Sequence, residues 1–244
     1  MGTPPVPRGQ REVLLSSSAA LGRSRQSLPR QTLVEAAYRA VRAAIVDGRF
    51  PPGRKLVVRA LAEELGLSQT PLKAALAALE REGFVIAITD RGYFVPRIDG
   101  EDLRQIYELR EVVDGIAARN AAHSDGRLEL VGILRDLLAQ QHSCVELGDL
   151  RRYSDLDVLF HSAIWQACGN PRLTQIAENL LGQLRIGSGT TAQIPGRLRG
   201  ALREHASILD AIEQSDSAAA EKHTRTHVRR ARNVLEKVLA SPAQ

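Results

Sequence analysis

The sequence contains little cysteine and few aromatic residues. Its two cysteines, Cys144 and Cys168, lie far apart and form no CxxC pair, which argues against a disulfide framework and against a thiolate zinc site. Aromatic residues make up 4% of the chain, so the core has to be built mainly from Leu, Ile, Val and Ala, with the single Trp165 inside it. A reducing compartment, the cytoplasm, fits this composition.

Long apolar runs are also missing. No stretch approaches the roughly 18 apolar residues that a membrane span needs, and the N-terminus lacks the compact apolar segment of a signal peptide. We therefore expect no association with a membrane. No heptad repeat and no internal repeat are evident, and 244 residues suffice for two modest domains with cores of their own.

Positive charge is unevenly distributed along the chain. Residues 1–97 hold 15 Lys and Arg against 8 Asp and Glu, whereas residues 98–244 hold 18 against 20. A polyanionic partner for the first part is the simplest explanation, because neutralising phosphates supplies most of the non-specific affinity for DNA. Residues 1–30 are rich in Pro, Ser, Gly and Arg and are expected to form a disordered basic arm, which either touches DNA or is a solvated tail.

Two helices are predicted at the start of the first domain, which we place at residues 31–97. The first covers 32–47, with Thr32 as its N-cap and Gly48 at its end. A loop rich in Pro and Gly leads to a short helix over 58–65, which Gly66 terminates.

A third helix and a hairpin follow a tight turn. Ser68 is the predicted N-cap of this helix, Pro71 falls in its first turn, and Gly83 ends it. The β-prone runs 85–88 and 93–95 then flank the turn sequence TDRG. Helix, turn, helix and hairpin in this order predict a winged helix-turn-helix, whereas a helical hairpin in a protein interface is the alternative.

In such a module the second helix of the motif enters the major groove with the side chains that do not pack inward. Gln69 and Lys73 can bond to bases, and Arg59 and Arg91 suit phosphate or minor-groove contacts. The predicted DNA-binding residues are Arg59, Ser68, Gln69, Thr70, Lys73 and Arg91.

The run LAEELGLSQTPLKAALAALEREGF resembles the pattern LA..LGVSRTPVREAL..L...G of the GntR family of bacterial transcription regulators. Members of that family commonly carry Arg where this chain has Gln69 and Lys73, so the usual operator pattern does not carry over. Arg59 falls at the other basic contact position of the family. The resemblance implies a regulator that binds a palindromic double-stranded DNA operator as a homodimer.

Residues 101–240 show only helical patterns, broken by turn signals, and predict an antiparallel bundle of about six helices. The expected fold is thus mainly α, with a small β-hairpin wing. All six histidines lie in this half. On the helix around 151–168, Asp157 and His161 are four residues apart and share the apolar face. A carboxylate there has to be paired or bound to metal.

His205 and His227 also point inward by helical spacing. One Asp and three His in a bundle make a plausible site for zinc, nickel or manganese, while core histidines bonded to Asp157 and to backbone carbonyls are the alternative. His223 competes with His227, being one turn earlier. His123 and His142 are expected at the surface.

The segments Asp157-Val-Leu-Phe160-His161 and Glu204-His205, followed by His227, resemble the FCD domain of the FadR-like subgroup of GntR regulators. The resemblance implies that Asp157, His161, His205 and His227 bind a divalent metal ion at the floor of a cavity for a small organic acid. Arg110 matches a common arginine of the family and is the candidate for binding the acid, or else a surface ion pair with Glu111 or Asp114.

These patterns predict an effector-controlled transcription regulator, a repressor, and not an enzyme. A metalloenzyme fused to a DNA-binding domain, or a regulator that senses the metal itself, are the alternatives. Glu204 adjoins His205 but points about 100° away on a helix, so it is poorly placed as a general base for an enzyme.

Overall fold

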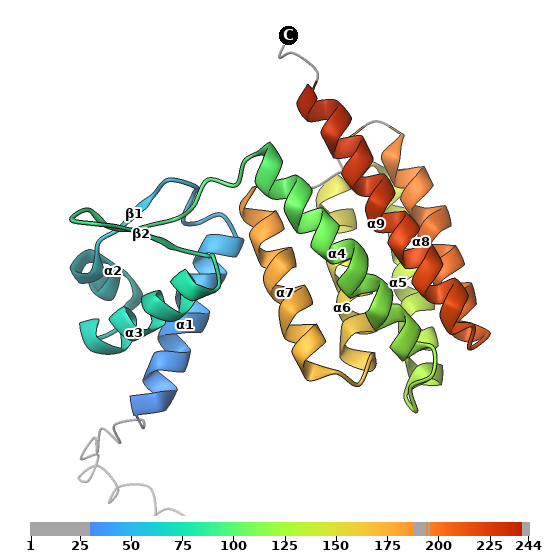
Figure 1. Ribbon diagram of the computed structural model, residues 1–244, viewed down its shortest axis with the longest axis horizontal. Coiled ribbons are helices and arrows are strands. Elements are labelled where there is room, and N and C mark those ends of the chain that lie inside the picture. The colour runs from blue at the N-terminus through green and yellow to red at the C-terminus, as the bar shows by residue number, and fades with distance from the viewer. Residues whose placement is uncertain (1–29, 188–193, 195, 241–244) are drawn as a thin grey trace, which may run out of the picture.

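The computed structural model describes residues 30–187, 194 and 196–240. The predicted arm at 1–30 lies outside them but for Arg30. The described part forms two units joined by the connection 95–99 (Figure 1), a small one from α1 to β3 and a helical bundle from α4 to α9. None of the described helices is long and apolar enough to cross a membrane.

The first unit is a winged helix-turn-helix, as predicted. Its helices are α1 (Arg30–Val46), α2 (Val58–Leu65) and α3 (Gln69–Arg81), and its strands are β1 (Lys55–Leu56), β2 (Ile86–Ile88) and β3 (Gly92–Phe94). The antiparallel sheet has the order β1-β3-β2, with Ile86 opposite Phe94 and Leu56 opposite Tyr93. Its core is formed by fully buried side chains from all three helices and from the turn before the wing, among them Val41, Leu61, Leu72, Leu76 and Phe84.

Three local details differ from the sequence prediction. Helix α1 begins at Arg30, so Thr32 lies inside its first turn and is not its cap. Ser68 does occupy the extended N-cap position of α3, but its side chain makes no capping hydrogen bond. Strand β1 was not predicted, because two residues are too few to show an alternating pattern. Gly66 ends α2 in the left-handed conformation, as expected for a glycine there.

The second unit is an antiparallel bundle of six helices within the described residues, as predicted. They are α4 (Gly100–Ala121), α5 (Arg127–Leu147), α6 (Leu150–Ala167), α7 (Pro171–Ile186), α8 (Arg197–Glu213) and α9 (Ser217–Ala240). Asp99 caps α4 by accepting bonds from the backbone N–H groups of Glu101 and Asp102, and Asp102 bonds back to Asp99. Trp165 and Phe160 are buried in the core of the bundle.

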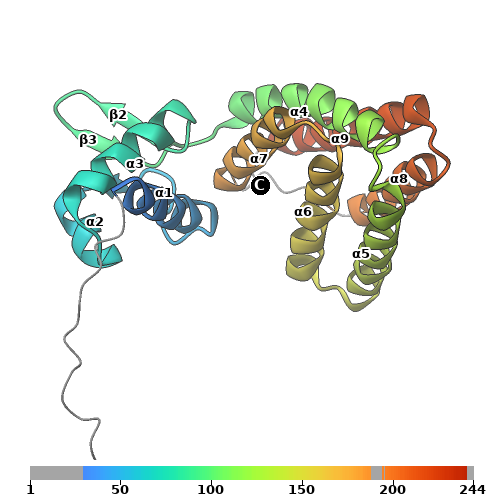
Figure 2. The ribbon, with the colours of Figure 1, turned by 90° about the horizontal axis from the view of Figure 1, so that it is seen from below.

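Helix α7 is the part of the bundle that packs against the first unit (Figures 1 and 2). The Ile186 side chain, near the end of α7, is buried in the core of the winged helix-turn-helix. Arg42 of α1 donates to the backbone oxygen of Glu178 at 3.0 Å. The two units are therefore joined by side-chain packing as well as by the chain.

Candidate metal and effector site

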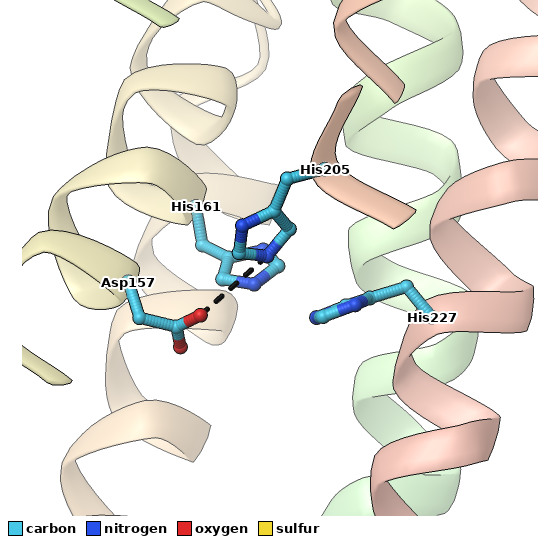
Figure 3. A group of neighbouring side chains, drawn as sticks. All are labelled: Asp157, His161, His205 and His227. Carbon is cyan, nitrogen blue, oxygen red and sulfur yellow. Dashed lines mark ion pairs between the residues drawn. The ribbon is translucent and has the colours of Figure 1, made fainter. Parts of the chain in front are cut away.

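Four side chains predicted as metal ligands converge between α6, α8 and α9 (Figure 3). Asp157 and His161 come from α6, His205 from α8 and His227 from α9, and one potential ligand atom of each lies within 4.8 Å of the others. The three histidines are buried, whereas the Asp157 side chain is 35% exposed because it borders a cavity. We call these four residues the Asp/His cluster.

His227 is oriented by a carboxylate outside the cluster. Its Nδ1 lies 2.8 Å from Oε2 of Glu204, one helix away on α8. Donation from Nδ1–H to Glu204 leaves Nε2 of His227 as a lone-pair donor, the form that a metal ion requires. Burial by itself would raise the pKa of Glu204, but the hydrogen bond from His227 and the charges of His227 and Arg197 lower it overall.

His205 is oriented in the same way by an amide. Its Nδ1 lies 2.9 Å from Oε1 of Gln141 on α5, and both side chains are fully buried. The other ring nitrogen, Nε2, has no hydrogen-bond partner and lies 3.5 Å from Oδ1 of Asp157. Burial lowers the pKa of His205 well below its usual value, so the ring is neutral at neutral pH.

The Asp/His cluster fits a divalent ion. His161 Nδ1 and His205 Nε2 are buried without a hydrogen-bond partner, and a metal would satisfy one atom of each ring. Burial lowers the pKa of His161 well below its usual value, which keeps it neutral, and raises the pKa of Asp157, which a cation would offset. The separations of up to 4.8 Å are close to the roughly 4.2 Å that two ligands on opposite sides of an ion can span.

A cavity of about 360 Å³ opens beside the cluster. Asp157, His161 and His227 line it, and so do Arg110 and Arg197. Two of the lining groups are buried without a hydrogen-bond partner, the Tyr153 hydroxyl and Nε of Arg197. The cavity therefore combines a potential cation site with two unsatisfied donors, which is an arrangement suited to an anionic oxygen ligand.

Arg110 is buried, so the interpretation of this residue as a surface ion pair is wrong. Its Nη2 and Nε atoms lie 2.8 and 3.2 Å from Oδ2 of Asp114, one turn further along α4. The indole N–H of Trp165 donates to the other oxygen of Asp114 at 3.0 Å. Asp114 thus compensates the charge of Arg110 within the wall of the cavity.

The remaining histidines lie apart from the cluster. His223 borders a separate groove with Arg203 and Ser207, and does not compete with His227. His123 and His142 are exposed.

All of the predicted DNA-binding residues are exposed, namely Arg59, Ser68, Gln69, Thr70, Lys73 and Arg91. Gln69, Thr70 and Lys73 lie on α3, Ser68 is its N-cap, and Arg91 lies in the turn of the wing. Arg59 pairs with Glu63 at 3.4 Å on the surface of α2.

Sequence reasoning missed three residues around the cluster: Gln141, Arg197 and Glu204. Gln141 did leave a signal, because it is the one polar residue on the apolar stripe that Leu134, Leu137 and Cys144 mark on α5. Glu204 was considered only as a general base beside His205, and its partner is on the following helix. Arg197 follows a glycine at the start of α8 and had no recognisable pattern.

Comparison with known proteins supports the same division of the chain. Residues 33–95 match the family of bacterial regulatory proteins named gntR, and residues 105–230 match the FCD domain. A probable D-xylose utilization operon transcriptional repressor of Paenarthrobacter nicotinovorans is 30% identical over 185 residues, which cover 75% of this chain and 79% of the relative.

The transcriptional regulator McbR of Escherichia coli is 28% identical over 177 residues, covering 69% of this chain and 77% of McbR. A solved structure of E. coli McbR/YncC has the same fold, with a TM-score of 0.70 and 22% identity over 84% of this chain and 98% of that one. These matches are regulators, which favours regulation over the alternative of a metalloenzyme. The chain belongs to the GntR family of DNA-binding transcription regulators, in which its winged helix-turn-helix is joined to an FCD domain.

Proposed function

We propose that this regulator changes its affinity for an operator when a small organic acid binds beside a divalent metal ion in the Asp/His cluster. We further propose that it is a repressor and that a homodimer reads a palindromic operator. The name of the Paenarthrobacter relative, a probable transcriptional repressor, supports the sign of regulation. The need to contact two half-sites supports the dimer.

The observation that carries the proposal is the pair of unsatisfied donors in the cavity. The Tyr153 hydroxyl and Nε of Arg197 are buried beside the cluster with no partner. Leaving such groups unpaired costs about 1–3 kcal/mol each, and a carboxylate can accept from both. Arg110 adds positive charge to the same wall, but Asp114 already engages it, so Arg197 is the better candidate for direct contact.

The metal would be held by Asp157, His161, His205 and His227 and would supply a positive charge with room for a carboxylate oxygen. A donor set of one carboxylate and three imidazoles suits zinc, nickel or manganese. A regulator that senses the metal alone needs no further space, whereas this cavity has room for about a dozen water molecules at about 30 Å³ each. The volume therefore favours an organic effector.

The experiment compares the parent protein with His205→Ala, using His142→Ala as the control at an exposed histidine. An operator is first obtained by selection of DNA from a random pool with the parent protein. Metal content is then measured, and operator affinity is titrated with metal and with small carboxylates separately. We expect carboxylates to change the operator affinity of the parent by roughly 1–3 kcal/mol.

His205→Ala should contain less metal and should lose most of this response while still binding the operator. His142→Ala should behave like the parent. A parent protein that binds no metal under replete conditions would contradict the proposal, and so would a His205→Ala variant that responds to carboxylates as the parent does. A response to metal alone would favour the metal sensor.

A further inference from the structure

One side of the cavity is formed by the DNA-binding unit. Val46, Asp47 and Gly48, at the end of α1, line the cavity together with residues of the bundle. We call these three residues the α1 wall. Val46 is half-buried and also packs against the core of the winged helix-turn-helix. A ligand that fills the cavity therefore contacts the same rigid unit that carries α3.

We propose that the α1 wall is the second end of the effector site, which takes an acid with an apolar portion: the carboxylate lies at the Asp/His cluster and the apolar portion reaches Val46. This inference rests on the proposed function, since it assumes that an acid binds in the cavity.

The lining of the cavity supports the apolar portion. A carboxylate occupies only a small part of about 360 Å³. Apart from the groups near the cluster, much of the lining is apolar and comes from α6, α7 and α9, namely Val158, Leu181, Leu184, Val228 and Ala231. Burying one methylene against such a surface improves affinity about fourfold. Affinity for straight-chain acids is thus expected to rise with length until the chain meets the α1 wall.

Helix α7 explains why contact at the α1 wall would be felt by the DNA-binding helix. Leu181 and Leu184 face the cavity, whereas Gly182 and Gln183 between them contact the segment after α3. Nε2 of Gln183 donates to the backbone oxygen of Glu82 at 2.8 Å. A Cβ atom on Gly182 would lie 2.6 Å from the ring of Phe84, so the two units are in direct contact there.

An ion pair ties the α1 wall to the same helix. Nη2 of Arg185 lies 3.9 Å from Oδ1 of Asp47, and both side chains are partly exposed at the rim of the cavity. Such a pair is weak and can open. An acid too long for the cavity would push Val46 away from Leu181 and Leu184, and would thereby shift α1 and α3 relative to the bundle.

The test uses full-length, zinc-loaded protein and the straight-chain monocarboxylates from acetate to octanoate. Binding is measured by calorimetry for the parent, for Val46→Phe and for Val46→Ala. Val34→Phe and Val34→Ala are matched controls, because Val34 lies on the same helix, is also half-buried and does not line the cavity. Operator affinity is measured with each acid in parallel.

In the parent, affinity should rise about fourfold per methylene and then level off. Val46→Phe should move this break to shorter acids and Val46→Ala should move it to longer ones, while acetate affinity and both Val34 controls stay unchanged. The acid length at which operator affinity changes should move with the break.

If acids bind but the break is the same in all five proteins, the α1 wall is not part of the site, and the proposed function stands without it. If the zinc-loaded proteins bind none of the acids, the proposed function fails and this inference fails with it. The two opposite substitutions keep the test decisive if one of them does not fold.

Discussion

Glu204 and His227 are joined by a 2.8 Å hydrogen bond that links the Asp/His cluster to the outer surface of the bundle. The same carboxylate lies 2.9 Å from Arg197, which lines the cavity, and 3.2 Å from Arg230, which is exposed. Glu204 therefore balances two arginines while it fixes the orientation of a potential metal ligand. A residue that appears to have no role beside His205 is connected to both the cation site and the anion site.

Replacing Glu204 by Gln should weaken metal binding about 10–100-fold, the usual loss when a partner of a metal-bound histidine is removed. Competition with a chelator of known affinity measures the effect on zinc. Glu146→Gln is the control, since Glu146 lies near His142 on the exposed side of α5. Equal zinc affinity in both variants would show that Glu204 does not position His227.

The buried pair of Arg110 and Asp114 should be important for stability. Asp114→Ala leaves a buried guanidinium and the Trp165 indole without their acceptor, and the loss of one partner of a buried pair typically costs about 3–5 kcal/mol. Denaturant unfolding of the metal-free protein measures this cost. Glu35→Ala removes the exposed pair with Arg39 and should cost at most about 1 kcal/mol. Similar losses in the two variants would mean that the buried pair is not special.

Two basic side chains are expected to matter for the operator. Lys73→Ala and Arg59→Ala should each weaken DNA binding by about 1–3 kcal/mol if the contact is to a base. A uniform loss over all sequences, with a shallower dependence on salt, would indicate a phosphate contact instead. Lys222→Ala, at an exposed lysine of α9, is the control and should bind as the parent does. Unchanged affinity in both test variants would remove α2 and α3 from the proposed DNA interface.

The domain boundary proposed at 97–101 can be tested with a fragment of residues 101–244. This fragment keeps α4 to α9 and all four residues of the Asp/His cluster. It should be helical, unfold cooperatively and bind zinc, but it should not bind DNA. Circular dichroism, metal analysis and operator binding check each point. A fragment that is unfolded would show that the packing of Ile186 against the first unit is required for folding.

The sequence alone was enough to predict those features that repeat at helical spacing. Asp157 and His161 were recognised because both lie on a face that also carries Tyr153 and Phe160, and a polar group there needs a partner. Helix ends were less reliable, since α1 begins two residues before the predicted cap at Thr32. Propensity does not fix such positions when packing further along the helix holds it in place.

Contacts between distant segments were not predictable. The hydrogen bond between Glu204 and His227 depends on how α8 and α9 pack, and neither residue has a motif for the other. The α1 wall is more than a hundred residues from the cluster in the chain, and only the packing of α7 against α1 brings them to one cavity. No local pattern in the sequence reports such a meeting.

The connection between the two units has a further consequence for how strong their interface has to be. It runs only from Val95 to Asp99, between β3 and α4. A short tether of this kind holds its ends at an effective concentration in the millimolar range. Contacts too weak to join two separate molecules, such as those of Arg42 and Gln183, are then sufficient to keep the units docked. A ligand that contributes a few kcal/mol can change the balance between docked and undocked arrangements without having to break a strong interface.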